Sequence, residues 1–145
     1  MEKSKREVAT LVPYCLIRKV PRFFLQKRDM GAPTYAGYFG FFGGSIEQGE
    51  TPEDAVMRET QEELLFSPVD HILFSRYETR RSINHVFFLF VDKGFDEAVT
   101  VCEGEYGAFL TLAEVVAHER AGIVLTSDLL ALQELSEYLL QSTAL

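Results

Sequence analysis

The segment INHVFFLFVD, residues 83–92, is the feature that most restricts the folds open to this chain. It is almost continuously apolar and lacks the polar–apolar alternation of a half-exposed strand. Such a run is expected of a strand that other elements cover on both faces. Its longest apolar part, Val86–Val91, is far shorter than the roughly 20 residues that span a bilayer. We therefore predict a central strand with Phe87, Phe88 and Phe90 in the core.

Patterns on either side of this segment predict further strands and helices. Residues 7–18 and 22–28 are rich in β-forming residues and are separated by Val20-Pro21, which predicts a hairpin. The other predicted strands lie at 38–44, 71–78 and 106–112, and the predicted helices lie at 51–64, near 112–119 and at 127–141. Because strands and helices do not strictly alternate, we predict an α/β (α+β) fold with a mixed sheet between helices. The whole chain, 1–145, is expected to form a single domain.

The charge balance restricts the partners of this domain. Lys and Arg number 14 against 22 Asp and Glu, so the net charge is −8. A surface that binds a nucleic acid polymer should be basic, so no such partner is expected. A phosphorylated small molecule is compatible with this charge, because a bound cation can reverse the local sign.

The sequence shows no feature that would place the chain in a membrane or outside the cell. The N-terminal residues MEKSKREVAT are charged and precede no long apolar stretch, so no signal peptide is predicted. Cys15 and Cys102 have no CxxC or other metal-binding spacing, and both are expected to be buried and reduced. These observations favour a cytoplasmic protein that has no membrane partner.

The segment 51–64 carries the start signals of a helix. Thr51 is a favourable N-cap, Pro52 suits the first helical position, and Asp54 can complete a capping box. On a helical wheel of about 100° per residue, one face of this helix is suited to packing on the sheet. That face consists of Val56, Met57, Thr60 and Leu64.

Three glutamates, Glu59, Glu62 and Glu63, fall within about 100° of one another beside that face. Carboxylates three or four residues apart on a helix repel one another, and partial burial raises their pKa values. A hard divalent cation such as Mg²⁺ or Mn²⁺ removes this conflict, because it binds carboxylate oxygens and substrate phosphates. The alternative is a solvated acidic face without a ligand.

A glycine-rich turn, GGSIEQGE at residues 43–50, comes immediately before the helix. Gly43 and Gly44 allow the backbone to approach a ligand closely, and a carbonyl oxygen in such a loop can join a metal shell. A glycine pair alone is weak evidence, because most such pairs only form turns. Its position directly before the three glutamates favours the metal site over the solvated face.

The turn and the helix together, GGSIEQGETPEDAVMRETQEELLF, resemble the Nudix box, which is written G-x5-E-x7-R-E-U-x-E-E-x-G-U with U a bulky apolar residue. The positions filled at the correct spacing are Gly44, Glu50, Arg58, Glu59, Glu62, Glu63 and Phe66. Thr60 stands at the first U, and Leu65 replaces the last glycine. The order of the flanking elements also resembles the Nudix α/β/α sandwich, so the resemblance covers essentially the whole chain.

This resemblance implies a hydrolase that requires Mg²⁺ or Mn²⁺ and cleaves a nucleoside diphosphate linked to another group X. It implies that Glu59, Glu62 and Glu63 bind the metal, with Glu59 also a candidate for the base that activates water. It further implies that Gly43 offers its carbonyl oxygen to a metal.

Other residues of the box resemble its supporting residues. Arg58 is similar to the arginine that orients the glutamates, and its planar guanidinium suits bidentate pairing with a carboxylate. Its alternative role is an exposed helix charge. Glu50, together with Gly44, resembles the part of the box that supports the junction of loop and helix.

A second acidic segment, VCEGEYGAFLTL at 101–112, resembles the E-G-x-x-G-x-aromatic segment that follows the box in some members of the family. In those members the glutamate reaches the metals from a loop, which implies that Glu103 is a further metal ligand. Glu105 is the nearby alternative. A pair of exposed loop acids without a ligand explains the segment equally well.

Residues that select the substrate are less clearly marked. Aromatic faces stack on nucleobases, so Tyr38 and Phe39 are candidates, together with Tyr35. Arg28, at the end of the second predicted strand, is a candidate for contact with a phosphate. The other candidates for that contact are Arg76, Arg80 and Arg81, although an arginine of this kind is more often a surface charge.

Two residues are expected to have structural roles near the site. His85, beside the buried strand, is expected to be a hydrogen-bonded structural histidine. Leu65 occupies the position where a glycine would take a left-handed conformation and end the helix. Because that conformation is sterically unfavourable for leucine, the helix is expected to end by another route, helped by Ser67-Pro68.

The leading hypothesis is a metal-dependent pyrophosphohydrolase that uses water to cleave a nucleoside triphosphate or a nucleotide sugar. Its partner would be a small-molecule nucleotide, and the protein would be a monomer or a homodimer. The alternative is a catalytically inactive Nudix-fold module that binds a nucleotide or acts as a sensor. Such modules usually arise by loss of box carboxylates, and here Glu59, Glu62 and Glu63 are all present.

Overall fold

The computed structural model describes residues 5–67 and 72–143. Its strands are β1 (Arg6–Ile17), β2 (Val20–Lys27), β3 (Phe39–Gly40), β4 (Phe42–Ser45), β5 (Ile72–Glu78), β6 (Ser82–Phe90) and β7 (Tyr106–Thr111). Its helices are α1 (Pro52–Leu64), α2 (Phe95–Ala98), α3 (Leu112–Arg120) and α4 (Thr126–Thr143). The predicted strand at 38–44 is divided into β3 and β4, and the short helix α2 was not predicted.

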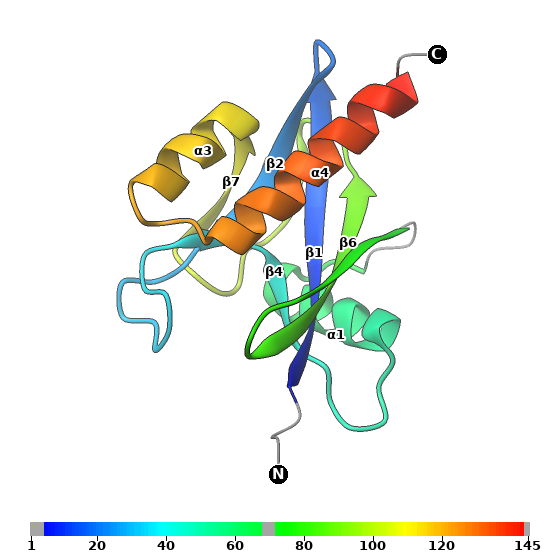
Figure 1. The fold of residues 1–145 in the computed structure, drawn as a ribbon, viewed down its shortest axis with the longest axis vertical. Coiled ribbons are helices and arrows are strands. Elements are labelled where there is room, and N and C mark those ends of the chain that lie inside the picture. The colour runs from blue at the N-terminus through cyan, green and yellow to red at the C-terminus, as the bar shows by residue number, and fades with distance from the viewer. Residues whose placement is uncertain (1–4, 68–71, 144–145) are drawn as a thin grey trace.

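The strands form one mixed sheet in the order β3-β2-β1-β6-β5, with β4 paired to β1 and β7 paired to β2. The predicted hairpin is present, because β1 and β2 are antiparallel with Ile17 opposite Val20. The predicted central strand β6 lies between β1, to which it is parallel, and β5. In Figure 1, α4 crosses in front of the sheet and α1 lies behind it. The structure therefore confirms a mixed sheet between helices.

Two hydrophobic clusters on opposite faces of the sheet explain the apolar run in β6. Phe87 points into the cluster that α1 covers, and Phe88 points into the cluster that α4 covers. Leu11 and Val12 of β1 divide between the two clusters in the same way. Adjacent residues of a strand face opposite sides of the sheet, so a strand buried on both sides needs apolar residues at consecutive positions.

One stripe of leucines on α4 is buried. Its members are Leu129, Leu132, Leu135 and Leu139. They lie in the same cluster as Val115 of α3, so both C-terminal helices cover one face of the sheet. Among the residues that the structure describes, no helix combines the length and apolar character needed to cross a membrane.

Two predictions of burial are wrong. Phe90 is the last residue of β6 and its exposed fraction is 59%, because the cover of the central strand ends before it. Cys102 is exposed, whereas Cys15 is buried, and both thiols are free. The prediction for His85 agrees with the structure, since the buried ring places Nε2 3.2 Å from Oε1 of Glu7.

Helix α1 begins as predicted and ends differently. Thr51 is the N-cap, and its side chain and that of Asp54 form the reciprocal hydrogen bonds of a capping box. At the other end Leu65 adopts the left-handed conformation, with φ 49° and ψ 42°, so the expected alternative exit is wrong. This conformation costs about 1–2 kcal/mol for a leucine. Beside it Leu64 is fully buried, and the backbone N–H of Leu65 donates to the carbonyl oxygen of Gln61 at 3.1 Å. Pro68, which was expected to help, lies outside the described residues.

Candidate active site

Arg58 of α1 joins the helix to the turn before it through a network of ion pairs. Its Nε and Nη2 donate to the two carboxylate oxygens of Glu50 at 2.9 and 3.0 Å. Nη1 donates to Oε1 of Glu59 at 2.9 Å, and Nη2 also donates to the carbonyl oxygen of Ser45 at 3.1 Å. The hydrogen bond from Arg58, together with one from the backbone of Glu47, lowers the pKa of Glu50. The bidentate fork therefore fixes Glu50 and Glu59 relative to each other.

The glycine pair makes room for two carboxylates of α1. The backbone N–H of Gly43 donates to Oε2 of Glu63 at 2.9 Å. A Cβ at Gly44 would lie 2.6 Å from Oε1 of Glu59, closer than a real side chain allows. A Cβ at Gly43, where φ is 133°, would overlap the carbonyl oxygen of Ala9 in β1. Glycine is required at both positions for the helix to bring its carboxylates against β4.

Burial and mutual repulsion shift the acidity of these carboxyls. Burial raises the pKa of Glu63 to about 9; the hydrogen bond from Gly43 opposes this shift, and Glu103 and Glu59 add to it. Burial also raises the pKa of Glu59, and Arg58 opposes that shift. The three carboxyls Glu59, Glu63 and Glu103 therefore lie close enough to disfavour one another's charge.

The loop after α2 carries Glu103 to this cluster. The backbone N–H of Cys102 donates to the carbonyl oxygen of Glu63 at 2.7 Å, and the side chain of Gln26 donates to the carbonyl oxygen of Glu103 at 2.9 Å. Glu103 lines the cleft described below, whereas the exposed Glu105 does not. Of the two acids proposed from the sequence, the structure brings Glu103 to the helix glutamates.

Glu62 is the most exposed of the three helix glutamates Glu59, Glu62 and Glu63. Its side chain is 60% exposed, and its Oε1 lies 3.6 Å from Nη1 of Arg58. Glu59 and Glu63 face the glycine pair, whereas Glu62 lies at the outer edge of the cluster. Glu59 and Glu63 therefore lie together at the glycine pair, and Glu62 lies farther out than the prediction implied.

The donor chemistry of this cluster fits a hard divalent cation. Carboxylate oxygens are the ligands that Mg²⁺ and Mn²⁺ prefer, and a cation bound between Glu59 and Glu63 would offset the burial and mutual repulsion that raise their pKa values. Within the described ranges, no three carboxylate, imidazole or thiol groups already have a metal-binding arrangement. Repulsion separates like charges until a cation joins them, so small rotations of the glutamate side chains would accompany binding.

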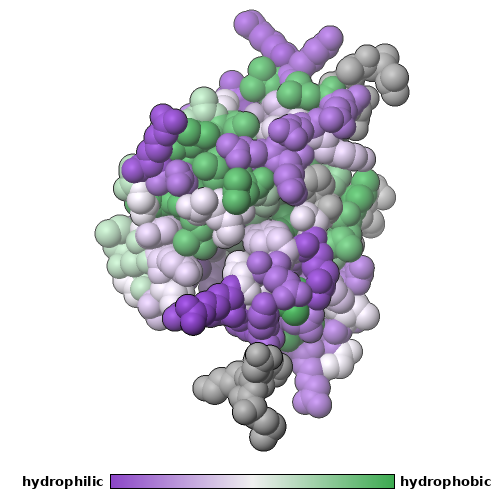
Figure 2. Space-filling model, viewed as in Figure 1, coloured by the Kyte–Doolittle hydropathy of each residue, from purple (hydrophilic) through white to green (hydrophobic). Residues whose placement is uncertain are grey.

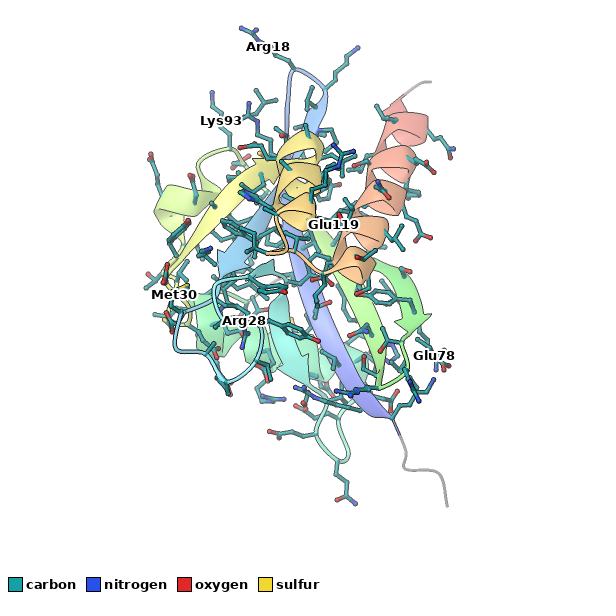
Figure 3. All side chains as sticks on the ribbon, turned by 60° about the vertical axis from the view of Figure 1, so that its left-hand side comes forward. Arg18, Arg28, Met30, Glu78, Lys93 and Glu119 are labelled. Atoms are coloured by element: carbon teal, nitrogen blue, oxygen red, sulfur yellow. The ribbon has the colours of Figure 1, made fainter. Side chains whose placement is uncertain are left out.

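A cleft of about 990 Å³ opens beside the cluster. It is lined by Glu59, Glu63, Glu103 and the glycine pair, and on its other sides by the loop after β2, the β5–β6 turn and the start of α4. Arg28 lies against that loop, where its Nε donates to the carbonyl oxygen of Thr34 at 2.9 Å (Figure 3).

The aromatic candidates differ in how much ring they offer to this cleft. Tyr38 is half-buried and lines the cleft, with its ring centroid 5.3 Å from that of Tyr35. Phe39 is only 6% exposed, and its ring packs between Lys27 and His118. The prediction that Phe39 stacks on a base therefore does not fit its packing, because little of the ring is free.

Sequence reasoning missed a polar pair at the far wall of the cleft. The hydroxyl of Tyr77 donates to Oδ1 of Asp128 at 3.3 Å, and both residues line the cleft. Oδ2 of Asp128 lies 4.0 Å from the place where a Cβ on Gly40 would stand. In the sequence, Asp128 lies at the start of the predicted helix at 127–141, and no pattern there indicated its contact with Tyr77.

These observations place a carboxylate cluster, a braced arginine and a glycine turn at the wall of one large cleft. A model of the NUDIX domain matches residues 6–127. The chain belongs to the NUDIX family. The 8-oxo-dGTP diphosphatase of Escherichia coli (strain K12) is 37% identical to this NUDIX chain over 81 residues, which are 54% of this chain and 62% of that protein. The match thus spans less than two-thirds of that relative.

Solved structures of other NUDIX proteins share the fold. A mutT/nudix family protein from Listeria innocua has a TM-score of 0.78 at 14% identity, over 97% of this chain and 98% of that one. The NUDIX domain of Shewanella oneidensis NrtR, solved in complex with ADP ribose, has a TM-score of 0.73 at 17% identity, over 95% of this chain and 90% of that one. At these identities the likeness concerns the fold.

The contact between Gly44 and Glu59 leads to a first prediction. Gly44→Ala in this NUDIX protein is expected to push the Glu59 carboxyl off its position, because the new Cβ would stand 2.6 Å from Oε1. Activity should fall at least tenfold while the protein stays folded, since Gly44 has no left-handed backbone to strain. Steady-state hydrolysis and circular dichroism measure the two effects. Gly94→Ala is the matched control, because open space surrounds Gly94 and its φ of −90° suits alanine; an equal loss of activity there would contradict the prediction.

A second prediction concerns the pH dependence of stability. Burial raises the pKa of Asp128 to about 7, with the hydrogen bond from Tyr77 opposing the shift. Between its ordinary pKa of 3.8 and 7 the folded NUDIX domain holds a proton that the unfolded chain releases, so this group's contribution to the unfolding free energy falls as pH rises. The fall is at most about 1.4 kcal/mol per pH unit.

Asp128→Asn removes this dependence. Urea unfolding from pH 4 to pH 8 should show the variant gaining stability relative to the native chain up to about pH 7, and then a constant difference. A difference that does not change with pH would show that Asp128 titrates normally.

Proposed function

We propose that this NUDIX protein is a hydrolase that uses Mg²⁺ or Mn²⁺ and water to cleave the P–O–P linkage of a small-molecule nucleotide, either a nucleoside triphosphate or a nucleotide sugar. The observation that carries the proposal is the meeting of Glu59, Glu63 and Glu103 at the Gly43–Gly44 turn, at the wall of a cleft of about 990 Å³. The diphosphatase relative supports the same reaction class.

The carboxylates would hold the cation. Glu59, Glu63 and Glu103 line the cleft, and Glu62 and the carbonyl oxygen of Gly43 complete the proposed donor set. When bound, a divalent cation polarises phosphoryl oxygens and lowers the pKa of a coordinated water. The Glu62 side chain lies apart from the other three carboxylates and would turn towards them when the cation binds.

The protein side chains supply the proton transfer and the orientation. Glu59 accepts the proton of the attacking water, because it is half-buried beside the cleft and its raised pKa makes it a better base than a free carboxylate. Arg58 keeps one oxygen of Glu59 occupied at 2.9 Å and leaves the other oxygen of the carboxylate for water or metal. Glu50 holds Arg58 in place from the other side.

The polar wall of the cleft would bind the nucleoside. Tyr77 and Asp128 offer a hydroxyl and a carboxyl at the start of α4, and hydrogen-bonding groups of this kind read the polar edges of a base. Tyr38 offers a partly free aromatic ring nearby for stacking. Arg28, on the adjacent loop, offers a guanidinium for a phosphate.

One experiment tests this function. The protein is incubated with Mg²⁺ or Mn²⁺ and a panel of nucleoside triphosphates, nucleotide sugars, ADP-ribose and dinucleoside polyphosphates, and the released phosphates are identified. Turnover of at least one substrate, abolished by a chelator, is expected. Nucleotide binding in a calorimeter without any turnover would instead favour the inactive module, an alternative supported by the fold shared with the NrtR domain that was solved with ADP ribose.

A further inference from the structure

Three arginines line one end of the cleft, and nothing in the proposed reaction has used them. Arg6 begins β1, and Arg80 and Arg81 form the turn between β5 and β6; we name these three residues the arginine cluster. Figure 2 shows hydrophilic side chains gathered over this turn, on the face that α4 crosses in Figure 1. The carboxylates Glu59 and Glu63 belong to the same cleft.

The arginine cluster lacks the ion pairs that its neighbours make. Lys5 and Arg76 both pair with Glu78, at 2.8 and 3.6 Å. Among residues 5–67 and 72–143, no carboxylate pairs with any member of the arginine cluster. The chain carries 22 acidic residues against 14 basic ones, so acidic partners are abundant. Three arginines left without a carboxylate in a cleft are suited to an anionic ligand.

Hydrogen bonds hold the arginine cluster in position. Nε of Arg6 donates to the hydroxyl oxygen of Ser45 at 2.6 Å, and the backbone N–H of Arg6 donates to the carbonyl oxygen of Arg81 at 3.2 Å. The hydroxyl oxygen of Thr79 accepts from the backbone N–H groups of Arg81 and Ser82 at 3.3 and 3.1 Å. The backbone of the turn is therefore ordered, so less backbone entropy is lost when a ligand binds.

Contacts along the segment from Gly40 to Ser45 show the order in which the polar groups lie along the cleft. Asp128 stands by Gly40, Glu59 stands by Gly44, and Arg6 is bonded to Ser45. The carboxylates thus lie between the polar wall and the arginine cluster. A nucleotide with its base at Asp128 and its scissile anhydride at the carboxylates would extend its remaining group X towards the arginines.

We propose that the arginine cluster binds phosphate groups of X, so that the preferred substrate is a nucleoside triphosphate or longer polyphosphate, in preference to a nucleotide whose X is a neutral sugar. This inference rests on the proposed function. The water oxygen bonds to the phosphorus on the nucleoside side of the anhydride and its proton passes to Glu59. The bridging P–O bond breaks, and its electron pair stays on the oxygen of the departing phosphate that carries X. When X is itself a phosphate, Arg6, Arg80 and Arg81 bind that terminal phosphate of the leaving group.

Kinetics with two substrates of the same base test the proposal. Arg6→Ala and the double variant Arg80→Ala, Arg81→Ala are compared with the native chain on a nucleoside triphosphate and on a nucleoside diphosphate sugar. Each variant should lose about tenfold or more in kcat/KM on the triphosphate, because a hydrogen bond to a charged group is worth about 1.5–3 kcal/mol. On the sugar nucleotide kcat/KM should change less than threefold.

Arg76→Ala is the matched control. Arg76 precedes Tyr77 in β5 and faces the opposite side of the sheet, where it pairs with Glu78 at the edge of the molecule (Figure 3). This variant should behave as the native chain on both substrates. The proposal would be overturned if the arginine-cluster variants lost kcat/KM equally on both substrates, or if they lost none on the triphosphate.

A binding measurement separates this proposal from the proposed function. Inorganic tripolyphosphate is titrated into each protein in a calorimeter at two salt concentrations. Weaker binding in the arginine-cluster variants than in Arg76→Ala supports the anion site, even if the native chain hydrolyses neither substrate. Identical binding in all variants overturns the anion site, even if the native chain is an active hydrolase.

Discussion

Glu63→Gln is expected to lower kcat by about 10²–10⁴-fold and at the same time to stabilise the metal-free protein. Glu63 is only 5% exposed, and burial raises its pKa to about 9, with further increases from Glu103 and Glu59. The glutamine removes a buried carboxyl and keeps an oxygen that can accept from the N–H of Gly43. Loss of a proposed metal ligand is then expected to lower activity while the folded state becomes more stable.

The stabilising effect of Glu63→Gln on the metal-free protein should increase with pH. The folded protein holds a proton on Glu63 that the unfolded chain releases above its ordinary pKa of 4.5, so the native unfolding free energy falls as pH rises from about 4.5 to 9. Urea unfolding without metal should show a larger advantage for Glu63→Gln at pH 8 than at pH 5. Glu105→Gln, which changes an exposed carboxyl outside the cleft, is the control. Normal activity in Glu63→Gln would remove the proposed metal site.

Arg58→Ala is expected to lower both activity and stability. The change removes the hydrogen bonds to Glu50, Glu59 and the carbonyl oxygen of Ser45, and leaves carboxylates without a counter-charge. The hydrogen bond that Arg58 donates to Glu50 is the main reason why the pKa of the Arg58 guanidinium is raised. Because the Arg58 side chain is 26% exposed, the loss of stability should be moderate, about 1–3 kcal/mol. Chemical unfolding and steady-state kinetics measure the two effects.

Arg58→Lys tests whether Arg58 acts through its positive charge or through the geometry of its hydrogen bonds. A lysine keeps the positive charge but cannot bond both oxygens of Glu50 and also reach Glu59 and Ser45. We expect it to recover part of the stability and little of the activity. Full recovery of activity by lysine would show that Arg58 supplies only charge.

The sequence predicted the fold well because the strongest patterns were local. The apolar run at 83–92 and the capping signals of Thr51 and Asp54 depend on neighbours within one element, and the structure has both. The box motif predicted the glutamates for the same reason, since its spacing follows the turn of a single helix. The structure adds that the Glu62 side chain is 60% exposed, which the helical spacing alone did not predict.

Features that depend on contacts between distant segments were missed. Phe90, like Phe88, stands between apolar residues in the sequence, and yet as the last residue of β6 it is exposed. Asp128 meets Tyr77 across a separation of 51 positions, which no local pattern reveals. Leu65 shows the opposite error, since a local steric rule excluded the left-handed conformation that this residue adopts.

The main-chain anchors of the Glu103 loop have a consequence for how the site responds to its ion. Cys102 is tied to the last turn of α1, and Gln26 holds the carbonyl oxygen of Glu103 itself. The backbone on which this carboxyl sits is therefore fastened both to a helix and to a central part of the sheet. Glu103 can adjust only by turning about its own side-chain bonds, so cations of different radius would be accommodated by rotamer choice while the loop stays still.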